Sequence, residues 1–110
     1  MALALAPDDF AAKAGDAARL LKALAHEARL MVLCQLVEGE HSAGELQHAS
    51  GLSQSALSQH LARLREEGLV ATRRDAQTIF YRLADPNAMR VLETLAAIYC
   101  PPSRGKRKRT

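Results

Sequence analysis

The stretch SAGELQHASGLSQSALSQHLARLREEGLV, residues 42–70, has the pattern of two short consecutive helices. It opens with a capping box, in which Ser42 is the N-cap and Glu45 stands three residues further on. Gly51 permits a sharp turn, after which Ser53 caps a second helix. Two short helices joined by a tight, glycine-containing turn are typical of a helix-turn-helix.

The second of these helices, residues 53–67, has two different faces. Leu57, Leu61 and Leu64 share one stripe, so we expect them in the core. The opposite face carries short uncharged side chains and one arginine, which permit close approach to base edges, and a glutamine can pair bidentately with adenine. A plain solvated helix is the alternative interpretation. We predict DNA contacts by Gln54, Ser55, Ser58, Gln59 and Arg63.

An alternating pattern follows over LVATRRDAQTIFYRLAD, residues 69–85. It predicts a β-hairpin in which RDAQ, residues 74–77, is the polar link. A hairpin directly after a helix-turn-helix is a wing, whose tip arginines can reach the DNA backbone or the minor groove. We therefore expect Arg73 and Arg74 to contact DNA.

Helical spacing also predicts elements on both sides of this stretch. One alanine-rich helix starts at Asp8, and a second covers HEARLMVLCQLVEG, residues 26–39. A last helix begins with Asp85 as N-cap and Pro86 as its first residue. The predicted order is α-α-α-α-β-β-α, a mainly α fold with a β-hairpin, that is, a winged helix-turn-helix.

The chain of 110 residues is long enough for one domain. We assign residues 8–100 to that domain, residues 1–7 to a flexible N-terminus and residues 101–110 to a disordered basic tail. Five of the fifteen basic residues lie in residues 104–110, so residues 1–103 carry ten basic and twelve acidic side chains, a net charge of −2. Any DNA affinity of the folded part must therefore come from a local arrangement of charge.

The chain shows no sign of export or of membrane insertion. Its start, MALALAPDDF, lacks the positive segment of a signal peptide. No window approaches the roughly 18 apolar residues of a membrane span. We predict a cytoplasmic protein without membrane contact, in which two cysteines are not presumed to form a permanent disulfide.

The segments LLKALAHEARLMVLCQL, SAGELQHASGLSQSALSQHLARLREEGLV and TRRDAQTIFYRLAD resemble the ArsR/SmtB family of winged-helix repressors over nearly the whole chain. The resemblance implies a non-enzymatic homodimer, formed by the first and last helices. It also implies binding to a palindromic operator in double-stranded DNA, with the two reading helices in successive major grooves. By position, it assigns contacts with bases or phosphates to Gln54, Ser55, Ser58 and Gln59, and places Arg73 and Arg74 in the wing.

Cys34 in the second helix and Cys100 at the end of the last helix resemble the sulfide- and persulfide-responsive branch of this family, the BigR-, SqrR- and HlyU-like regulators. In that branch these two positions bridge on oxidation or sulfuration. The resemblance implies that a persulfide or an oxidant links Cys34 to Cys100 and releases the operator, without a cofactor. The alternative is a regulator or anti-repressor with inert cysteines, since a free cysteine is usually a small buried hydrophobe.

Other functions fit the sequence less well. A metal-responsive repressor of the zinc or arsenic type is the main alternative, but the segment 42–50 has no cysteine and the last helix has no histidine. The four histidines show no spacing of a tetrahedral site, so we predict no metal ligand, and His60 is interpreted as a packing residue. A thiol oxidoreductase is disfavoured because there is no C-x-x-C. A protein-interaction module that lost DNA binding also remains open.

Overall fold

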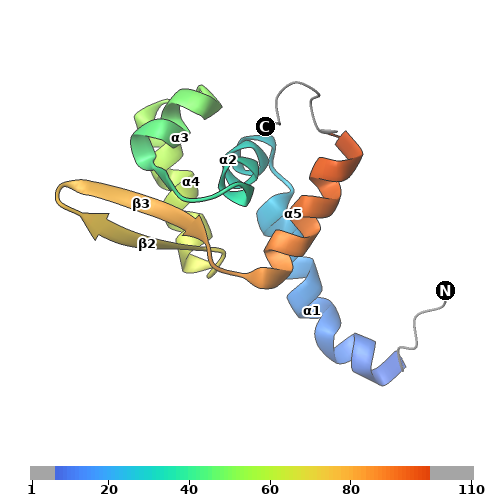
Figure 1. The fold of residues 1–110 in the computed structure, drawn as a ribbon. Coiled ribbons are helices and arrows are strands. Elements are labelled where there is room, and N and C mark those ends of the chain that lie inside the picture. Colours follow the sequence, from blue (N-terminus) through green and yellow to red (C-terminus); the bar gives the residue numbers. More distant parts are fainter. Residues whose placement is uncertain (1–6, 100–110) are drawn as a thin grey trace.

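The computed structural model describes residues 7–99. Within these residues, five helices and three strands follow one another (Figure 1). Their bounds are α1 (Pro7–Leu24), α2 (Glu27–Val37), β1 (His41–Ser42), α3 (Ala43–Ser50), α4 (Gln54–Glu66), β2 (Val70–Asp75), β3 (Thr78–Leu83) and α5 (Pro86–Tyr99). Of the predicted flexible N-terminus, residues 1–7, only Pro7 is described, and it was placed wrongly because it is the first residue of α1. Residues 1–6, the predicted basic tail and Cys100 lie outside the described residues.

Helices α3 and α4 form the predicted helix-turn-helix. The Ser42 hydroxyl accepts a hydrogen bond from the Glu45 amide at 3.1 Å, and the Glu45 carboxylate accepts one from the Ser42 amide at 2.8 Å, which completes the capping box. Gly51 ends α3 in the left-handed conformation, at a φ of 73°, which a glycine adopts without strain. The Ser53 hydroxyl then caps α4 by accepting from the Ala56 amide at 3.1 Å.

The wing is the hairpin of β2 and β3, and it belongs to a three-stranded antiparallel sheet in the order β1-β3-β2. The predicted element order lacks β1, because a strand of two residues is too short to produce an alternating pattern. The predicted link RDAQ was also too long. Arg74 pairs with Ile79 and Asp75 with Thr78, so only Ala76 and Gln77 form the turn.

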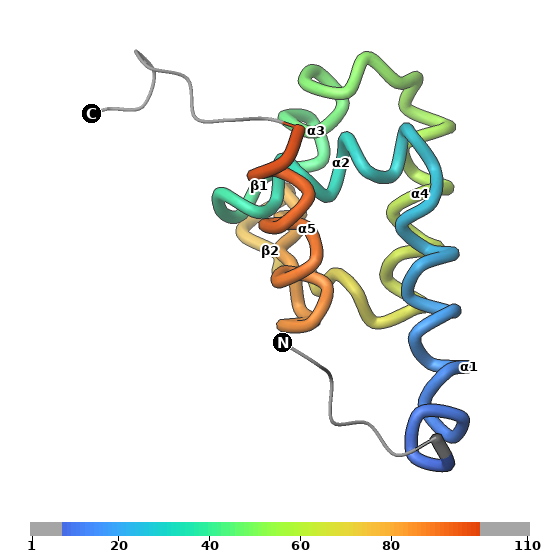
Figure 2. The backbone as a smooth tube through the Cα atoms, turned by 90° about the vertical axis from the view of Figure 1, so that its right-hand side faces the viewer, coloured from blue at the N-terminus to red at the C-terminus, as the bar shows by residue number. Residues whose placement is uncertain are grey.

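The core lies where α2, α3, α4 and α5 meet the base of the sheet. It is built almost entirely from leucine, valine and alanine, as the composition indicates. In Figures 1 and 2, α1 runs out from this body and its N-terminal part lies away from the other elements. No helix among residues 7–99 is long and apolar enough to cross a membrane. The largest fully buried side chains are those of Val32, Leu33, Leu36, Leu46, Leu64 and Leu92.

Candidate nucleic-acid interface and thiol site

Helix α4 separates its apolar and polar side chains as predicted. Leu57, Leu61 and Leu64 are at most 3% exposed and anchor the helix in the core. The first turn of α4 contains no acidic residue, so the positive end of the helix dipole is left for an anion such as a phosphate. Exposed side chains from the opposite face are those of Gln54, Ser55, Ser58, Gln59 and Arg63.

The loop that leads into α4 is fixed by its own hydrogen bonds. The Ser50 hydroxyl donates to the Gln47 carbonyl at 3.3 Å and accepts from the Leu52 amide at 3.2 Å. The Gly51 amide donates to the same Gln47 carbonyl at 3.0 Å. These bonds satisfy the backbone groups at the end of α3 and set the direction in which α4 begins.

His60 packs α4 against the residue that precedes α2. Its ring centroid lies 4.7 Å from that of His26. The Nδ1 atom of His26 is the N-cap acceptor of α2, at 3.2 Å from the Ala28 amide. Burial lowers the pKa of His60, and the nearby charges of His26 and Arg29 lower it further. The contact agrees with the interpretation of His60 as a packing residue.

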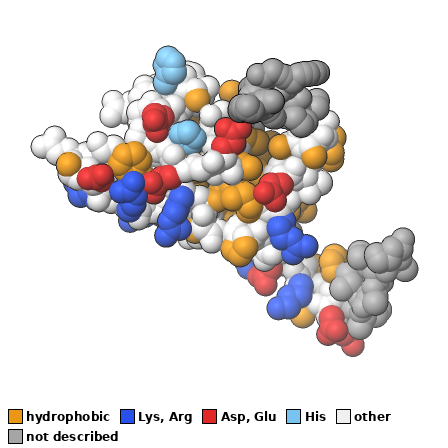
Figure 3. All heavy atoms as spheres, viewed as in Figure 1, with side chains coloured by type: hydrophobic (Ala, Val, Ile, Leu, Met, Phe, Trp, Pro, Cys, Tyr) orange, Lys and Arg blue, Asp and Glu red, His pale blue; other side chains and the backbone are white. Residues whose placement is uncertain are grey.

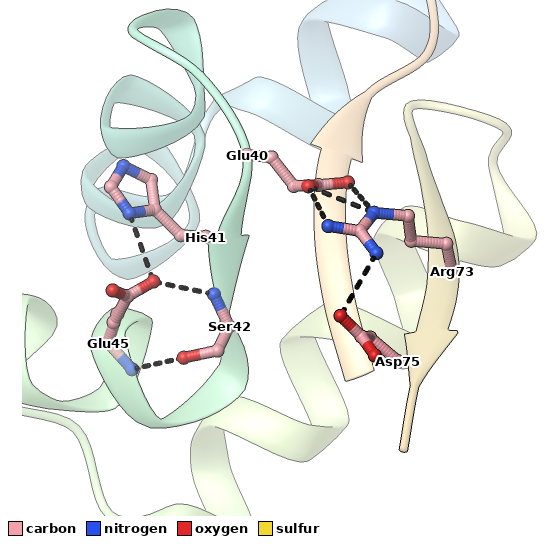
Figure 4. A network of polar contacts seen from close by, with 6 residues as sticks. All are labelled: Glu40, His41, Ser42, Glu45, Arg73 and Asp75. Atoms are coloured by element: carbon pink, nitrogen blue, oxygen red, sulfur yellow. Dashed lines mark hydrogen bonds and ion pairs between the residues drawn. The ribbon is translucent and has the colours of Figure 1, made fainter. Parts of the chain in front are cut away.

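Arg73 of the wing is bound by an acidic residue, Glu40, that was not predicted from the sequence. Its Nε atom donates to the two carboxylate oxygens of Glu40 at 3.0 and 2.9 Å, and its Nη2 atom donates to Oε1 at 2.8 Å (Figure 4). The guanidinium carbon also lies 4.5 Å from the ring centre of Phe80. The hydrogen bond from Arg73 is the main cause that lowers the pKa of Glu40, and the same bond raises the pKa of Arg73.

The two wing arginines therefore differ. The Nε–Nη2 edge of the Arg73 guanidinium group faces Glu40. Asp75 lies on the other side of the group, with 3.9 Å between Arg73 Nη1 and Asp75 Oδ2. Arg74 is exposed, and within residues 7–99 no ion pair or side-chain hydrogen bond of Arg74 is found. In Figure 3, acidic and basic side chains lie next to one another in the region of the hairpin. Of the two arginines, Arg74 is thus the one whose charge no acidic side chain among the described residues compensates.

Cys34 lies on α2, half-buried against the core. It borders an apolar pocket of about 210 Å³ between α2 and α5. Leu30 also lines this pocket from α2, and Leu95, Ala96 and Tyr99 line it from α5. The structure thus brings the side chain of Cys34 and the C-terminal turn of α5 to the same pocket.

The side chains that could bind a metal ion are not clustered in the described part of the chain. Across residues 7–99, no group of three or more histidine, cysteine, aspartate and glutamate side chains is placed to hold a metal ion. His41 instead contacts Glu45, with 3.4 Å between Nδ1 and Oε1, and His60 contacts His26.

Comparisons with known proteins agree with this architecture. Residues 26–72 match the family model of bacterial regulatory proteins of the arsR family. The biofilm growth-associated repressor of Agrobacterium fabrum is 53% identical over 90 residues, which cover 82% of this chain and 77% of the relative. The transcriptional repressor BigR of Xylella fastidiosa superposes with a TM-score of 0.81 at 46% identity, over 87% of this chain and 98% of that one.

A third relative is HlyU of Vibrio cholerae, a transcriptional activator that is 54% identical over 74% of this chain and 75% of its own length. Its reduced form superposes with a TM-score of 0.82 at 48% identity, over 84% of this chain and 98% of that one. These relatives are regulators of transcription, not enzymes. The chain therefore belongs to the ArsR family of bacterial regulatory proteins, among relatives of the BigR and HlyU type, and is a DNA-binding regulator of transcription.

Proposed function

We propose that the protein is a homodimeric repressor that binds a palindromic operator and releases it when Cys34 and Cys100 become linked. The observation that carries the proposal is the pocket shared by Cys34 and Tyr99. Tyr99 directly precedes Cys100 in the sequence, so Cys100 is bonded to a residue that lines the pocket of Cys34.

DNA reading is assigned to the exposed face of α4 and to Arg74. A helix of this kind enters the major groove with its N-terminal residues at the base edges. Two α4 helices of a dimer would read half-sites about 34–36 Å apart, one turn of DNA. The residues assigned to bases or phosphates are Gln54, Ser55, Ser58, Gln59, Arg63 and Arg74. Arg73 is left out of this set because Glu40 binds its guanidinium group.

The dimer is supported by apolar side chains that the single chain leaves exposed on its first and last helices. Phe10 and Leu21 of α1 are 52% and 59% exposed, and Ile98 and Tyr99 of α5 are 61% and 75% exposed. Large apolar side chains that a single chain leaves exposed on two of its helices are of the kind that an interface covers. The family resemblance assigns dimerisation to these same two helices.

The linking reaction needs an electrophilic sulfur donor. A persulfide RSSH transfers its outer sulfur to one thiolate, which gives a protein persulfide and the thiol RSH. The second thiolate then attacks the inner sulfur of that persulfide, so the disulfide forms and hydrogen sulfide leaves. If both cysteines are first converted to persulfides, the same attack leaves a trisulfide and one hydrogen sulfide.

A bridge would change DNA binding because it joins two elements with different tasks. Helix α2 contacts α3 of the helix-turn-helix, and α5 belongs to the proposed dimer surface. A plain disulfide requires Cα atoms within about 7 Å, whereas an added sulfur atom lengthens the reach. Pulling α2 toward α5 would alter the distance between the two α4 helices, and a pair of reading helices out of phase with one DNA turn loses affinity.

The test is operator binding by Cys34→Ser and Cys100→Ser proteins before and after treatment with glutathione persulfide. We expect each variant to bind the operator like the wild type when reduced, because neither thiol lies on α4 or in the wing. After treatment, only the wild type should lose affinity. Loss of affinity in both variants would contradict the bridge, and a tenfold response to zinc in the wild type would favour a metal-responsive repressor instead.

A further inference from the structure

The outer face of the wing carries a charge cluster that the proposed DNA contacts do not use. Arg73 of β2 lies over Phe80 of β3 and binds Glu40, which stands just before β1. Arg82 acts on the same carboxylate, since its positive charge helps to lower the pKa of Glu40. Asp75 approaches Arg73 from the side of the turn. The two acids therefore both lie against Arg73, and Arg82 is a second positive charge near Glu40.

We infer that Glu40 limits the affinity of the wing for DNA phosphates by occupying Arg73. A guanidinium binds a phosphate through the same planar fork with which it binds a carboxylate. Both ligands cannot use the Nε–Nη2 edge of Arg73 at once, and in this structure Glu40 holds it. Arg73 is thus a phosphate contact that Glu40 restrains.

The sheet places Arg73 where a released side chain could act on DNA. Arg73 is directly followed by Arg74, and successive side chains of a strand point to opposite faces. The hairpin is a single layer, so charges on either face lie within about one Debye length, ~8 Å at 0.15 M salt, of a phosphate beside the turn. Release of Arg73 would therefore add a positive charge to the wing at the place where Arg74 already acts.

The same ion pair could instead serve to brace the wing. Bracing by the Arg73–Glu40 ion pair should be the smaller of the two effects, because backbone hydrogen bonds already join β3 to both β1 and β2. The side chains of Arg73 and Glu40 are 51% and 29% exposed, and ion pairs exposed to this degree add little to stability. Loss of the carboxylate should therefore act on DNA binding mainly through charge.

The experiment measures the affinity of the full chain for a non-operator DNA duplex over a range of salt concentrations. Glu40→Gln should strengthen binding about fivefold per wing at 0.15 M salt and steepen the salt dependence by about 0.9 per wing, the effect of one added phosphate contact. Arg73→Ala should remove this gain in the Glu40→Gln protein and have a far smaller effect in the wild type. Glu38→Gln is the matched control, because Glu38 is exposed, has the same charge and does not contact Arg73.

Three results would overturn the inference. They are unchanged or weaker binding by Glu40→Gln, an equal gain from Glu38→Gln, and an equal loss from Arg73→Ala in both backgrounds. Thermal melts of each variant exclude unfolding as the cause. The inference rests on DNA binding by the wing, so a wild type that binds no duplex would overturn it together with the proposed function. With wild-type binding intact, the same three results would overturn the role of Glu40 alone.

Discussion

Replacing Gln59 with alanine isolates base reading from the other contributions to DNA binding. Gln59 is exposed on α4, and within the described residues its amide takes part in no intramolecular hydrogen bond. Its loss should therefore change the free energy of unfolding by less than about 0.5 kcal/mol, as is usual for such surface positions. Any larger effect of the change must come from the complex with DNA.

The magnitude follows from the type of contact. A bidentate pair between a glutamine and adenine contributes about 1–3 kcal/mol of discrimination. A dimer reads two half-sites, so the operator complex should lose at least about 2 kcal/mol, or roughly 30-fold in Kd. A non-operator duplex offers no matching base, so its Kd should change less than about twofold.

The assay is fluorescence anisotropy with the operator and with a scrambled duplex of equal length and at equal salt. Gln35→Ala on α2 is the control, because it removes the same side chain away from α4. An equal loss of affinity for both duplexes would refute the assignment of Gln59 to base reading. It would leave Gln59 as a phosphate contact or as a residue needed for the shape of α4.

The remaining predictions concern stability. Ser42→Ala removes half of the capping box of α3, so it should lower the free energy of unfolding by about 1 kcal/mol and the melting temperature by roughly 4–8 °C. Ser55→Ala is the control, because Ser55 caps no helix, and it should leave the melting temperature unchanged. Equal melting temperatures of the wild type and Ser42→Ala would contradict the cap. Burial lowers the pKa of His60 in the folded protein, so the unfolded chain binds more protons than the folded one below the ordinary histidine pKa of 6.5. The free energy of unfolding should therefore be highest above this pH and fall as the pH drops below it. Urea unfolding should show that the free energy of unfolding decreases less between pH 7.5 and pH 5.5 for His60→Gln than for the control His48→Gln, which removes an exposed histidine. Equal decreases in the two variants would exclude His60 as the group responsible.

Much of the fold could be predicted because its signals are local. The serines that cap α3 and α4, Gly51 between them and the leucine stripe of α4 each act within a few residues. The hairpin was predicted from alternation, but its turn was placed two residues too wide, since Arg74 and Asp75 are polar and still pair with β3. Polarity alone does not separate a turn from an exposed strand end.

The site was harder to predict where it depends on residues far apart in the sequence. Glu40 and Arg73 are 33 positions apart and meet only because β1 pairs with the central strand β3. A two-residue strand leaves no pattern, so the acid that binds Arg73 could not be identified. The apolar pocket beside Cys34 likewise forms only where α2 and α5 pack side by side. The amphipathic patterns of the two helices do not specify that they pack against each other.

Control of DNA binding by the Cys34–Cys100 bridge can be tested by intact mass spectrometry of the operator-free and operator-bound fractions after exposure to glutathione persulfide. We predict that the free fraction contains protein with an intramolecular Cys34–Cys100 link, as a disulfide or with one added sulfur, and that the bound fraction contains the reduced chain. Linked protein that stays on the operator, or free protein without a link, would contradict the claim that this bridge controls DNA binding.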